Sequence, residues 1–556
     1  MLDRLGKLRA ALDRAAFFVK TLRATDVIAP VRPARLVQFA RAASHTKIGP
    51  HLAVMFHAAA HPDKEAIVDD GEPGTPPRRF TWGELDAAIN RLAHALVTRG
   101  AGAGSRVAVM LPNGSEYLIA QQALARLGAT AVQIGYRLKA AEIGYILDNA
   151  SPAVTIVLAE YLPAMRDARM ATGRGGPMIA VGGSAPDAVA WETALASESP
   201  DAPPRTHGGD GGGVIIYTSG TTGKPKGANR KWKSTGFESV ADLMVQVGMK
   251  ADDRHLVVCP LYHSAAPAFV AITAALGATC VLMNHFDPEG ALALIERERI
   301  TSTLMVPTML VRITNLPPAI LAKYDTSSLR WVMSGAAPLA TDTARRFTER
   351  FGPILWNFYG STETGIVTLA GPHDHLAHPG TIGKRVRGNQ IALLDDAGHP
   401  VPPGQVGELY ARNTTLISGY HANPAATDAA QRDGFYTVGD LGRVDADGYY
   451  YLESRKHDMV ISGGVNIYPR EIEDLLHTHP AILEAAVIGV PDAEWGETLR
   501  AFVVVRDGQR VTEQEVIDYC RRELADYKRP RTVTFLAELP RNPTGKILKR
   551  ELRELA

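Results

Sequence analysis

The sequence predicts an α/β protein with a large N-terminal domain of two helix-covered, mostly parallel sheets and a small α+β C-terminal domain. Three observations predict this fold class. From about residue 51 to 370, short apolar runs alternate with helical stretches. From about 380 to 454, Gly, Pro and Asp turns separate short strands, as in a small β-barrel-like subdomain. Helices and strands then alternate again, so we place the domains at 51–455 and 456–556, after an extension at 1–50.

The apolar runs of the N-terminal domain carry no polar face. They lie at 106–111, 129–134, 256–259, 278–283, 302–306 and 329–333. Strands that are buried on both faces and separated by helices form parallel sheets covered on both sides. Thr81 and Glu84 form a capping box that opens one of the helices. The Pro-, Gly- and Ser-rich stretch 197–213 is predicted to link two such halves.

The later part of the chain has equally local signals. Residues 445–448 predict a hairpin in the β subdomain. Thr512 and Glu515 form a second capping box. The elements expected in the C-terminal domain are a helix near 470–477, strands near 485–489 and 501–505, and a helix over 512–525.

The composition narrows the class of protein. Of 556 residues, 46% are hydrophobic and 21% charged, which suits a large core in two or more domains. The net charge is +1, whereas nucleic-acid-binding proteins normally carry a concentrated basic surface, so the overall charge does not favour nucleic acid as a partner. The cysteines Cys259, Cys280 and Cys520 form no CxxC pair, which argues against a disulfide framework or a zinc cluster. Without a long apolar run or a signal-peptide core, we expect a cytoplasmic protein.

The extension at 1–50 is strongly basic. It has ten Lys or Arg residues against three Asp, a net charge of +7. Apolar residues recur in it at helical spacing, at Leu2, Leu5, Leu8, Leu12, Ala15, Val19 and Leu22. Such an amphipathic helix could make peripheral contact with an anionic membrane at its inner face. The alternative is a terminal helix that packs on its own domain, which is what most amphipathic helices do.

The segment YTSGTTGKPKG, residues 217–227, directly follows the apolar run 214–216. It offers backbone N–H groups freed by Gly220 and Gly223, the hydroxyls of Thr218, Ser219, Thr221 and Thr222, and the cations Lys224 and Lys226. A loop of this kind after a parallel strand can cradle phosphates. It is not a Walker A motif, because that pattern requires glycine at Thr218 and a hydroxyl at Pro225. A plain surface turn is the alternative.

This segment resembles the signature of the adenylate-forming superfamily, which includes acyl-CoA synthetases, luciferases and adenylation domains. Other motifs similar to that superfamily follow in order: SGAAP at 334–338, NFYGSTETG at 357–365, YTVGD at 436–440, SRKHDMVISGGVNIYPREIE at 454–473 and PRNPTGK at 540–546. The resemblance covers about residues 50 to 555. It implies ATP-dependent activation of a carboxylic acid, with ATP, Mg²⁺ and CoA as the small molecules used.

The resemblance implies that the loop at 218–226 holds the β- and γ-phosphates of ATP. It also implies that Thr362 contacts the α-phosphate and that Glu363 binds Mg²⁺. The implied nucleotide-binding residues are Thr218, Ser219, Gly220, Thr221, Thr222, Gly223, Lys224, Lys226, Gly335, Ala336, Ala337, Asn357, Phe358, Tyr359, Gly360, Ser361, Thr362, Asp440 and Arg455. Thr218 and Thr362 from this set, together with Glu363, are candidate catalytic residues.

Four residues have more specific implied roles. Tyr359 stacks on adenine, opposite a thin wall formed by 335–337. Asp440 accepts hydrogen bonds from the ribose hydroxyls, and Arg455 supports the same sugar. The catalytic Lys546 bridges the carboxylate and the α-phosphate, where a cation stabilises the developing charge. Taken one at a time, each could instead be a core aromatic, a turn cap or a surface lysine.

The resemblance also implies that the C-terminal domain is mobile. It rotates about His457 between acyl-AMP formation and thioester formation. The superfamily commonly has Asp or Lys at this hinge position, so His457 is a departure from the pattern. The segment Ser462, Gly463, Gly464 and Val465 is similar to the one that lines the pantetheine tunnel, where glycines let a thin arm pass close to the backbone.

The acyl pocket is expected at Tyr262, His263, Ser264, Ala265 and Gly335. Relatives that activate amino acids place an aspartate near the position of His263, so its absence argues against an amino acid. The small side chains favour a medium- or long-chain fatty acid. The alternatives are an aryl acid, a fatty acyl-AMP ligase that loads a carrier protein, and a membrane-docked component of fatty-acid uptake.

Overall fold

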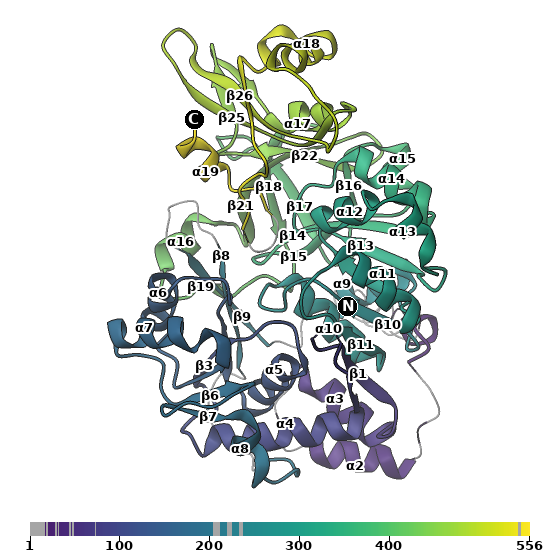
Figure 1. Cartoon of the computed structure of the whole chain (residues 1–556), viewed down its shortest axis with the longest axis vertical. Coiled ribbons are helices and arrows are strands. Elements are labelled where there is room, and N and C mark those ends of the chain that lie inside the picture. The colour runs from purple at the N-terminus through teal and green to yellow at the C-terminus, as the bar shows by residue number, and fades with distance from the viewer. Residues whose placement is uncertain are drawn as a thin grey trace, which may run out of the picture. The chain divides into compact units, whose positions relative to one another are not determined.

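The computed structural model describes residues 17, 20–27, 31, 33–43, 46, 49–72, 74–203, 212–218, 225–232, 237–542 and 546–556. The chain divides into two compact units (Figure 1). Unit 1 comprises Met1–Leu304, Leu316–Val332 and Asn413–Ala429. Unit 2 comprises Met305–Asn315, Met333–Arg412 and Ala430–Ala556. The domain boundary predicted after residue 455 stays a prediction. The two compact units are not divided there, because residues on both sides of 455 belong to unit 2.

One sheet of unit 1 carries the glycine- and threonine-rich loop. Its order is β19-β9-β8-β4-β3-β5-β6-β7. The strands β3 to β8 pair in parallel, whereas β9 and β19 pair antiparallel. The strand bounds are β3 (Arg106–Met110), β4 (Thr130–Gln133), β5 (Val154–Leu158), β6 (Met178–Val181), β7 (Ala188–Ala190), β8 (Gly213–Thr218), β9 (Lys226–Lys231) and β19 (Gly419–Tyr420). The chain's helices here are α4 (Trp82–Val97), α5 (Ser115–Leu127), α6 (Ala140–Ala150), η1 (Ala159–Tyr161), α7 (Leu162–Thr172), α8 (Trp191–Ala196) and α16 (Pro424–Ala429).

Unit 1 also contains a second set of mostly parallel strands. Strand β11 pairs in parallel with β1 and β10, and β2 closes the edge antiparallel to β1. The bounds are β1 (Glu65–Asp69), β2 (Arg78–Thr81), β10 (Arg254–Val257), β11 (Thr279–Leu282) and β12 (Ser302–Met305). The accompanying helices are α2 (Pro33–Ala43), α3 (His51–Ala60), α9 (Phe237–Val247), α10 (Ala265–Leu276), α11 (Pro288–Arg297) and α13 (Pro318–Lys323). Two helix-covered, mostly parallel sheets are therefore confirmed.

Unit 2 begins with antiparallel strands that carry most of the motif residues. Its first sheet follows the order β14-β15-β16-β22-β21-β18-β17. The bounds are β13 (Trp331–Ser334), β14 (Leu355–Ser361), β15 (Gly365–Ala370), β16 (Thr381–Arg385), β17 (Gln390–Leu394), β18 (Gly407–Arg412), β20 (Gln431–Arg432), β21 (Phe435–Val444) and β22 (Tyr450–Arg455). The short helices are α12 (Pro307–Thr314), α14 (Thr341–Phe351) and α15 (Asp374–Ala377). The hairpin predicted at 445–448 is confirmed, because β21 and β22 pair on either side of it.

The last part of unit 2 is a five-stranded sheet covered by helices. Its long central hairpin joins β25 (Ile482–Asp492) to β26 (Gly496–Val505). The remaining elements are β23 (Val460–Ser462), β24 (Val465–Ile467), α17 (Pro469–His477), α18 (Glu513–Glu523), η2 (Asp526–Lys528), β27 (Thr532–Phe535) and α19 (Lys549–Glu554). Alternate residues of the hairpin enter two separate cores, one around Val487 and Val503 and one around Ile488 and Phe502. Both predicted capping boxes, at Thr81 and at Thr512, are present.

Most of the helix predicted over 2–22 lies outside the described residues. The part that follows it packs on unit 1. Thr21 and Thr25 are buried, the N–H of Ala251 donates to the carbonyl of Thr25 (2.9 Å), and Lys250 pairs with Asp26 (2.6 Å). These contacts favour the packed alternative for that part of the extension. Within the described part of the chain, no helix is long and apolar enough to cross a membrane.

Candidate functional site

The glycine- and threonine-rich loop leaves β8 at Thr218 and returns into β9 at Lys226. These two residues face each other as the last pair of the antiparallel ladder, and the Thr218 hydroxyl lies 3.4 Å from the Lys226 carbonyl oxygen. The ladder therefore closes the base of the loop. The predicted phosphate-binding residues between them, Ser219, Gly220, Thr221, Thr222, Gly223 and Lys224, lie outside the described residues.

Three tyrosines fix the base of this loop, one from β8 itself and two from distant segments. The Tyr217 hydroxyl donates to Asn149 Oδ1 (2.6 Å), and the Tyr145 hydroxyl donates to the carbonyl of Pro225 (3.1 Å). Lys226 Nζ lies 5.3 Å from the centre of the Tyr420 ring, a cation–π contact. Sequence reasoning missed Tyr145 and Tyr420, because neither belongs to a motif and only the fold brings them to the loop.

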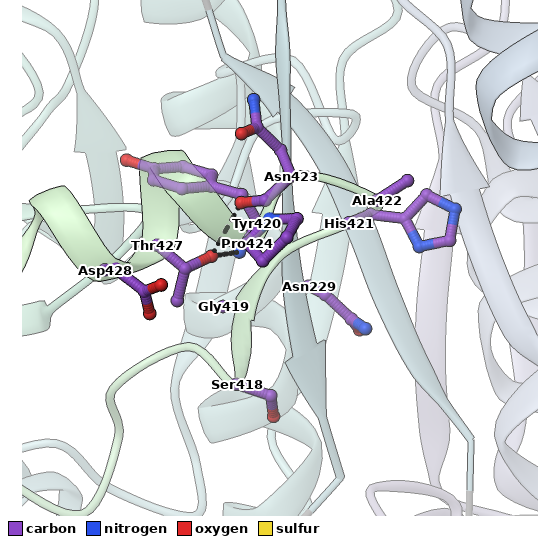
Figure 2. A pocket seen from close by; sticks show the side chains of 10 residues that line it. All are labelled: Asn229, Ser418, Gly419, Tyr420, His421, Ala422, Asn423, Pro424, Thr427 and Asp428. Carbon is purple, nitrogen blue, oxygen red and sulfur yellow. Dashed lines mark hydrogen bonds between the residues drawn. The ribbon is translucent and has the colours of Figure 1, made fainter.

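A polar hollow of about 340 Å³ lies beside Tyr420 (Figure 2). It is lined by Asn229, Ser418, Gly419, Tyr420, His421, Ala422, Asn423, Pro424, Thr427 and Asp428. The Thr427 hydroxyl accepts from the N–H of Tyr420 (2.9 Å) and donates to the carbonyl of Asn423 (3.0 Å). These bonds hold the turn that places Tyr420 under Lys226, so the hollow's lining supports the loop base.

In unit 2, Asp440 joins three strands that are distant in sequence. Its Oδ2 accepts from the Tyr359 hydroxyl of β14 (2.8 Å), and its Oδ1 lies 3.2 Å from Arg455 Nε of β22. Asp440 and Arg455 are direct partners in the β21–β22 ladder. Burial, followed by the Asp440 carboxylate, raises the pKa of Tyr359, so its phenol stays protonated and donates. The structure thus brings together three residues that the sequence assigned to one nucleotide.

Two motif glycines are required by close backbone approach. A Cβ at Gly335 would lie 2.5 Å from the Phe358 ring, and one at Gly360 would lie 2.0 Å from the Gly365 carbonyl oxygen. Ala336, next to Gly335, has φ of 66°, in the left-handed region that non-glycine residues seldom adopt. The backbone of this loop at Gly335 therefore lies close to the ring of Phe358, the residue before Tyr359.

The carboxamide of Asn357 gives a test of fit for adenine. Its Oδ1 is buried and has no hydrogen-bond partner among the residues that the structure describes. A buried acceptor is normally paired. The exocyclic amine of a purine is a donor that would complete it, so Asn357 and its neighbours fit an adenine nucleotide.

Glu363 follows a tight turn at the end of β14. The Ser361 hydroxyl accepts from the N–H groups of Glu363 and Thr364, both at 3.1 Å. Glu363 is buried, and no cluster of three or more His, Cys, Asp or Glu side chains that could hold a metal occurs in the described ranges. Mg²⁺ commonly binds through one or two carboxylates together with substrate phosphates rather than in a protein cage. A single buried carboxylate at Glu363 fits that mode.

Lys546 comes from the C-terminal segment and lies close to these residues. Its N–H donates to Asn542 Oδ1 and its carbonyl accepts from the N–H of Asn542, both at 2.9 Å. Burial lowers the pKa of Lys546 to about 8, and the Arg455 guanidinium adds to the lowering. The carboxylates of Asp440, Asp458 and Glu363 oppose it. The structure therefore places the predicted catalytic lysine within the field of the nucleotide residues.

The predicted hinge segment is held on both sides of His457. Lys456 Nζ contacts Asp396 (2.7 Å) and Glu408 (3.2 Å). Asp458 pairs with Arg553 of α19 (2.8 Å). Burial lowers the pKa of His457, so this residue is neutral near pH 7.

The predicted CoA segment forms the β23–β24 hairpin. Gly463 and Gly464 have φ of 56° and 81°, so both need the freedom of glycine. A Cβ on Gly463 would lie 2.7 Å from the Trp495 ring. Ile461, Val465 and Trp495 are exposed on this surface, and sequence reasoning missed Trp495, which lies on the turn of the neighbouring hairpin.

In the expected acyl pocket, Tyr262 and His263 precede α10, which begins at Ala265. Their rings lie 4.3 Å apart, and Tyr262 Oη and His263 Nε2 are buried. Gly335 belongs to unit 2 and these residues to unit 1.

Comparison with known proteins gives matches over nearly the whole chain. Residues 55–421 match a family described as AMP-binding enzyme, and residues 471–546 match the AMP-binding enzyme C-terminal domain. Feruloyl-CoA synthase of an Amycolatopsis species is 37% identical over 85% of this chain and 93% of its own length. The long-chain-fatty-acid–CoA ligase FadD13 of Mycobacterium tuberculosis is 34% identical over 89% of this chain and 96% of its own.

Solved structures agree with these matches. ATP-bound MatB from Rhodopseudomonas palustris superposes with a TM-score of 0.80 at 30% identity, covering 91% of this chain and 99% of that one. The anthranilate CoA ligase AuaEII in complex with anthranoyl-AMP superposes with a TM-score of 0.82 at 27% identity, covering 92% and 97%.

Proposed function

Because the chain belongs to the AMP-binding enzyme family and is an adenylate-forming acid–CoA ligase, we propose that its reaction centre is the cluster around Asp440 and Lys546. Ligases of this family use ATP, Mg²⁺ and CoA. The observation that carries the proposal is the meeting of Tyr359, Asp440 and Arg455 with a partly buried lysine from the C-terminal segment. A nucleotide held at Asp440 would have its phosphates within reach of that lysine's charge.

In the first step, a carboxylate oxygen of the acid forms a bond to the α-phosphorus of ATP and the bond to pyrophosphate breaks. The two reactants are both anionic, so cations must offset their repulsion. Lys546 supplies one such charge, and the loop at 218–226 with Thr362 contacts the phosphates. Glu363 would hold Mg²⁺, which neutralises phosphate charge when bound.

In the second step, the CoA thiol bonds to the acyl carbon and AMP leaves. We propose that rotation about His457 withdraws Lys546 and presents the segment at 462–465 to the pantetheine arm. The neighbouring glycines, Gly463 and Gly464, leave the backbone accessible, and Trp495 offers an apolar surface beside them. A carrier protein in place of CoA is the alternative thiol.

The identity of the acid is a separate question. The small side chains of Ser264 and Ala265 favour a medium- or long-chain fatty acid, and that stays a prediction. The relatives named above act, by their names, on ferulate and on long-chain fatty acids. The cytoplasmic location also stays a prediction.

The direct test is ATP–pyrophosphate exchange with a panel of fatty and aryl acids, followed by thioester formation with and without CoA. We expect acid-dependent exchange and a CoA-dependent thioester. Exchange without any CoA product would instead support the carrier-protein alternative. A complete absence of exchange across the panel would contradict the ligase.

Replacing the catalytic lysine should separate the two steps. Lys546→Ala is expected to lower the rate of acyl-AMP formation by roughly 10²-fold or more, because a cation that acts in the transition state is lost. Thioester formation from preformed acyl-AMP should change much less. Lys384→Ala, which removes an exposed lysine of the same unit, is the control. Equal losses in both steps would rule out this role for Lys546.

The CoA segment can be tested with a bulky residue. Gly464→Trp should leave pyrophosphate release nearly unchanged but lower acyl-CoA formation by about 10-fold or more, because the side chain obstructs a narrow passage. Gly508→Trp is a matched control. Both glycines are exposed and have positive φ, and a Cβ at either would meet no described atom within 4 Å. If both variants made acyl-CoA at the same rate, the segment at 462–465 would not be the CoA-binding segment.

Peripheral membrane contact has one supporting observation. Helix α2 leaves Leu36 and Val37 exposed, at 44% and 51%, within the basic extension. We expect the full-length protein to float with anionic liposomes and Leu36→Glu/Val37→Glu to float less, because charges replace the apolar contact. A chain that begins at Ile48 should also float less, and Val97→Glu/Met170→Glu alters apolar residues exposed elsewhere as the control. Equal flotation of all four would end the membrane proposal.

A further inference from the structure

We propose that Asn542 is the positioning residue of the predicted catalytic lysine, because its side chain clasps the backbone of Lys546 and holds the ammonium group in its partly buried setting. This inference rests on the proposed function, since Lys546 is the cation that acyl-AMP formation would use. It is carried by two hydrogen bonds that join the same two residues in opposite directions.

The two bonds close the turn that carries the lysine. The N–H of Lys546 donates to Asn542 Oδ1, and the N–H of Asn542 donates to the carbonyl of Lys546, both at 2.9 Å. One step outward, Arg541 and Ile547 form an antiparallel bridge. In a regular antiparallel pair, both bonds would join backbone groups. Here the acceptor for the N–H of Lys546 is a side chain, so the identity of residue 542 decides whether the turn is held.

The ends of this segment are anchored separately from the catalytic lysine. Arg541 pairs with Glu484 of β25 (2.6 Å), and Lys549 at the start of α19 pairs with Glu473 of α17 (2.7 Å). These ion pairs attach the segment to the C-terminal sheet and its helix, but neither of them involves the catalytic lysine. Asn542 therefore sets where that lysine lies between two fixed ends.

The setting of the ammonium group depends on its position. Burial lowers the pKa of Lys546 to about 8, and the Arg455 guanidinium adds to the lowering. The carboxylates that oppose it are Asp440, Asp458 and Glu363. A lysine side chain is a flexible four-carbon stem, so an open turn would let the ammonium group move toward water, where its pKa is higher. Asn542 is neutral, so replacing it with alanine removes the clasp without removing a charge.

The first test measures the pKa of Lys546 without any substrate. In the full-length protein, acetic anhydride acetylates only the deprotonated amine, and the rate at Lys546 is followed across neutral and alkaline pH by mass spectrometry of its peptide. The wild-type midpoint is expected at about pH 8. Asn542→Ala should raise it by about one pKa unit or more, toward that of an ordinary lysine, because the ammonium group regains solvent.

The second test follows catalysis in the two steps. Asn542→Ala should lower kcat/KM of ATP–pyrophosphate exchange with dodecanoic or cinnamic acid by about 10-fold or more, because a displaced catalytic group loses rate steeply. Thioester formation from the preformed acyl-AMP should change much less. Since Lys546 acts as a cation, wild-type kcat/KM should fall as the pH rises above about 8, and this fall should begin at a higher pH in the variant.

Two further variants control for structure. Asn542→Ser keeps a short oxygen acceptor for the same N–H and should restore most of the wild-type pKa and rate. Asn413→Ala removes a matched bond, from the N–H of Thr415 to Asn413 Oδ1 (2.7 Å), and should change neither. Both asparagines are half-buried.

An unchanged pKa of Lys546 in Asn542→Ala would overturn the inference even if activity fell, because a purely structural defect lowers the rate without moving that pKa. Equal losses in the two steps would overturn it as well. If the wild-type enzyme gave no exchange with either acid, the proposed function would be contradicted, and the labelling result alone would decide whether Asn542 holds the lysine.

Discussion

The buried carboxylate of Asp440 is the constraint on which the proposed nucleotide site depends. At 8% exposure it cannot rely on water, and an unpaired buried charge is costly. Its two oxygens are instead held by Tyr359 and Arg455. Removing either partner would leave an oxygen of this buried carboxylate unpaired, which is destabilising, so the arrangement is strongly specified. This pairing fixes β14, β21 and β22 relative to one another and leaves Asp440 oriented in advance for a ligand with paired hydroxyls.

The charges of Asp440 and Arg455 also affect the pKa of Lys546. Burial, and after it the Arg455 guanidinium, lowers the pKa of Lys546 to about 8, while the carboxylates of Asp440, Asp458 and Glu363 raise it. The pKa of Lys546 is therefore well below that of an ordinary lysine, and a shifted pKa of this kind is typical of a functional site. Lys546 reaches the site on a turn closed by Asn542, outside any helix or strand, whereas the nucleotide residues lie on or beside strands of a sheet. In the proposed reaction, the strands would hold the nucleotide through both steps. Lys546, which is carried on a separate segment, would be needed only for acyl-AMP formation.

The loop base and the acyl loop show the same principle in unit 1. Tyr145, Tyr217 and Tyr420 hold the described ends of the loop predicted to bind phosphates, and Asn113 and Tyr117 hold Leu261, which precedes Tyr262 and His263. Preorganisation of this kind lowers the entropy lost when a substrate binds. The two loops differ in what they leave unpaired. The loop that carries Tyr262 and His263 keeps two buried polar atoms without partners among the described residues, Tyr262 Oη and His263 Nε2.

The sequence by itself determined the features that depend on local physics. The unbroken apolar runs predicted parallel strands such as β3 and β10, and the capping boxes at Thr81 and Thr512 placed two helix starts. The motifs identified Tyr359, Asp440, Arg455 and Lys546 one by one. Only the tertiary structure decided that Asp440 pairs with Tyr359 and Arg455 within unit 2, and that Tyr145 and Tyr420 hold the base of the 218–226 loop within unit 1. It also decided that Trp495 lies beside Gly463, and that Tyr262 and His263 keep polar atoms without partners among the described residues. The reason is that periodicity and capping act over a few residues, whereas these contacts join segments up to hundreds of residues apart and depend on how the sheets pack.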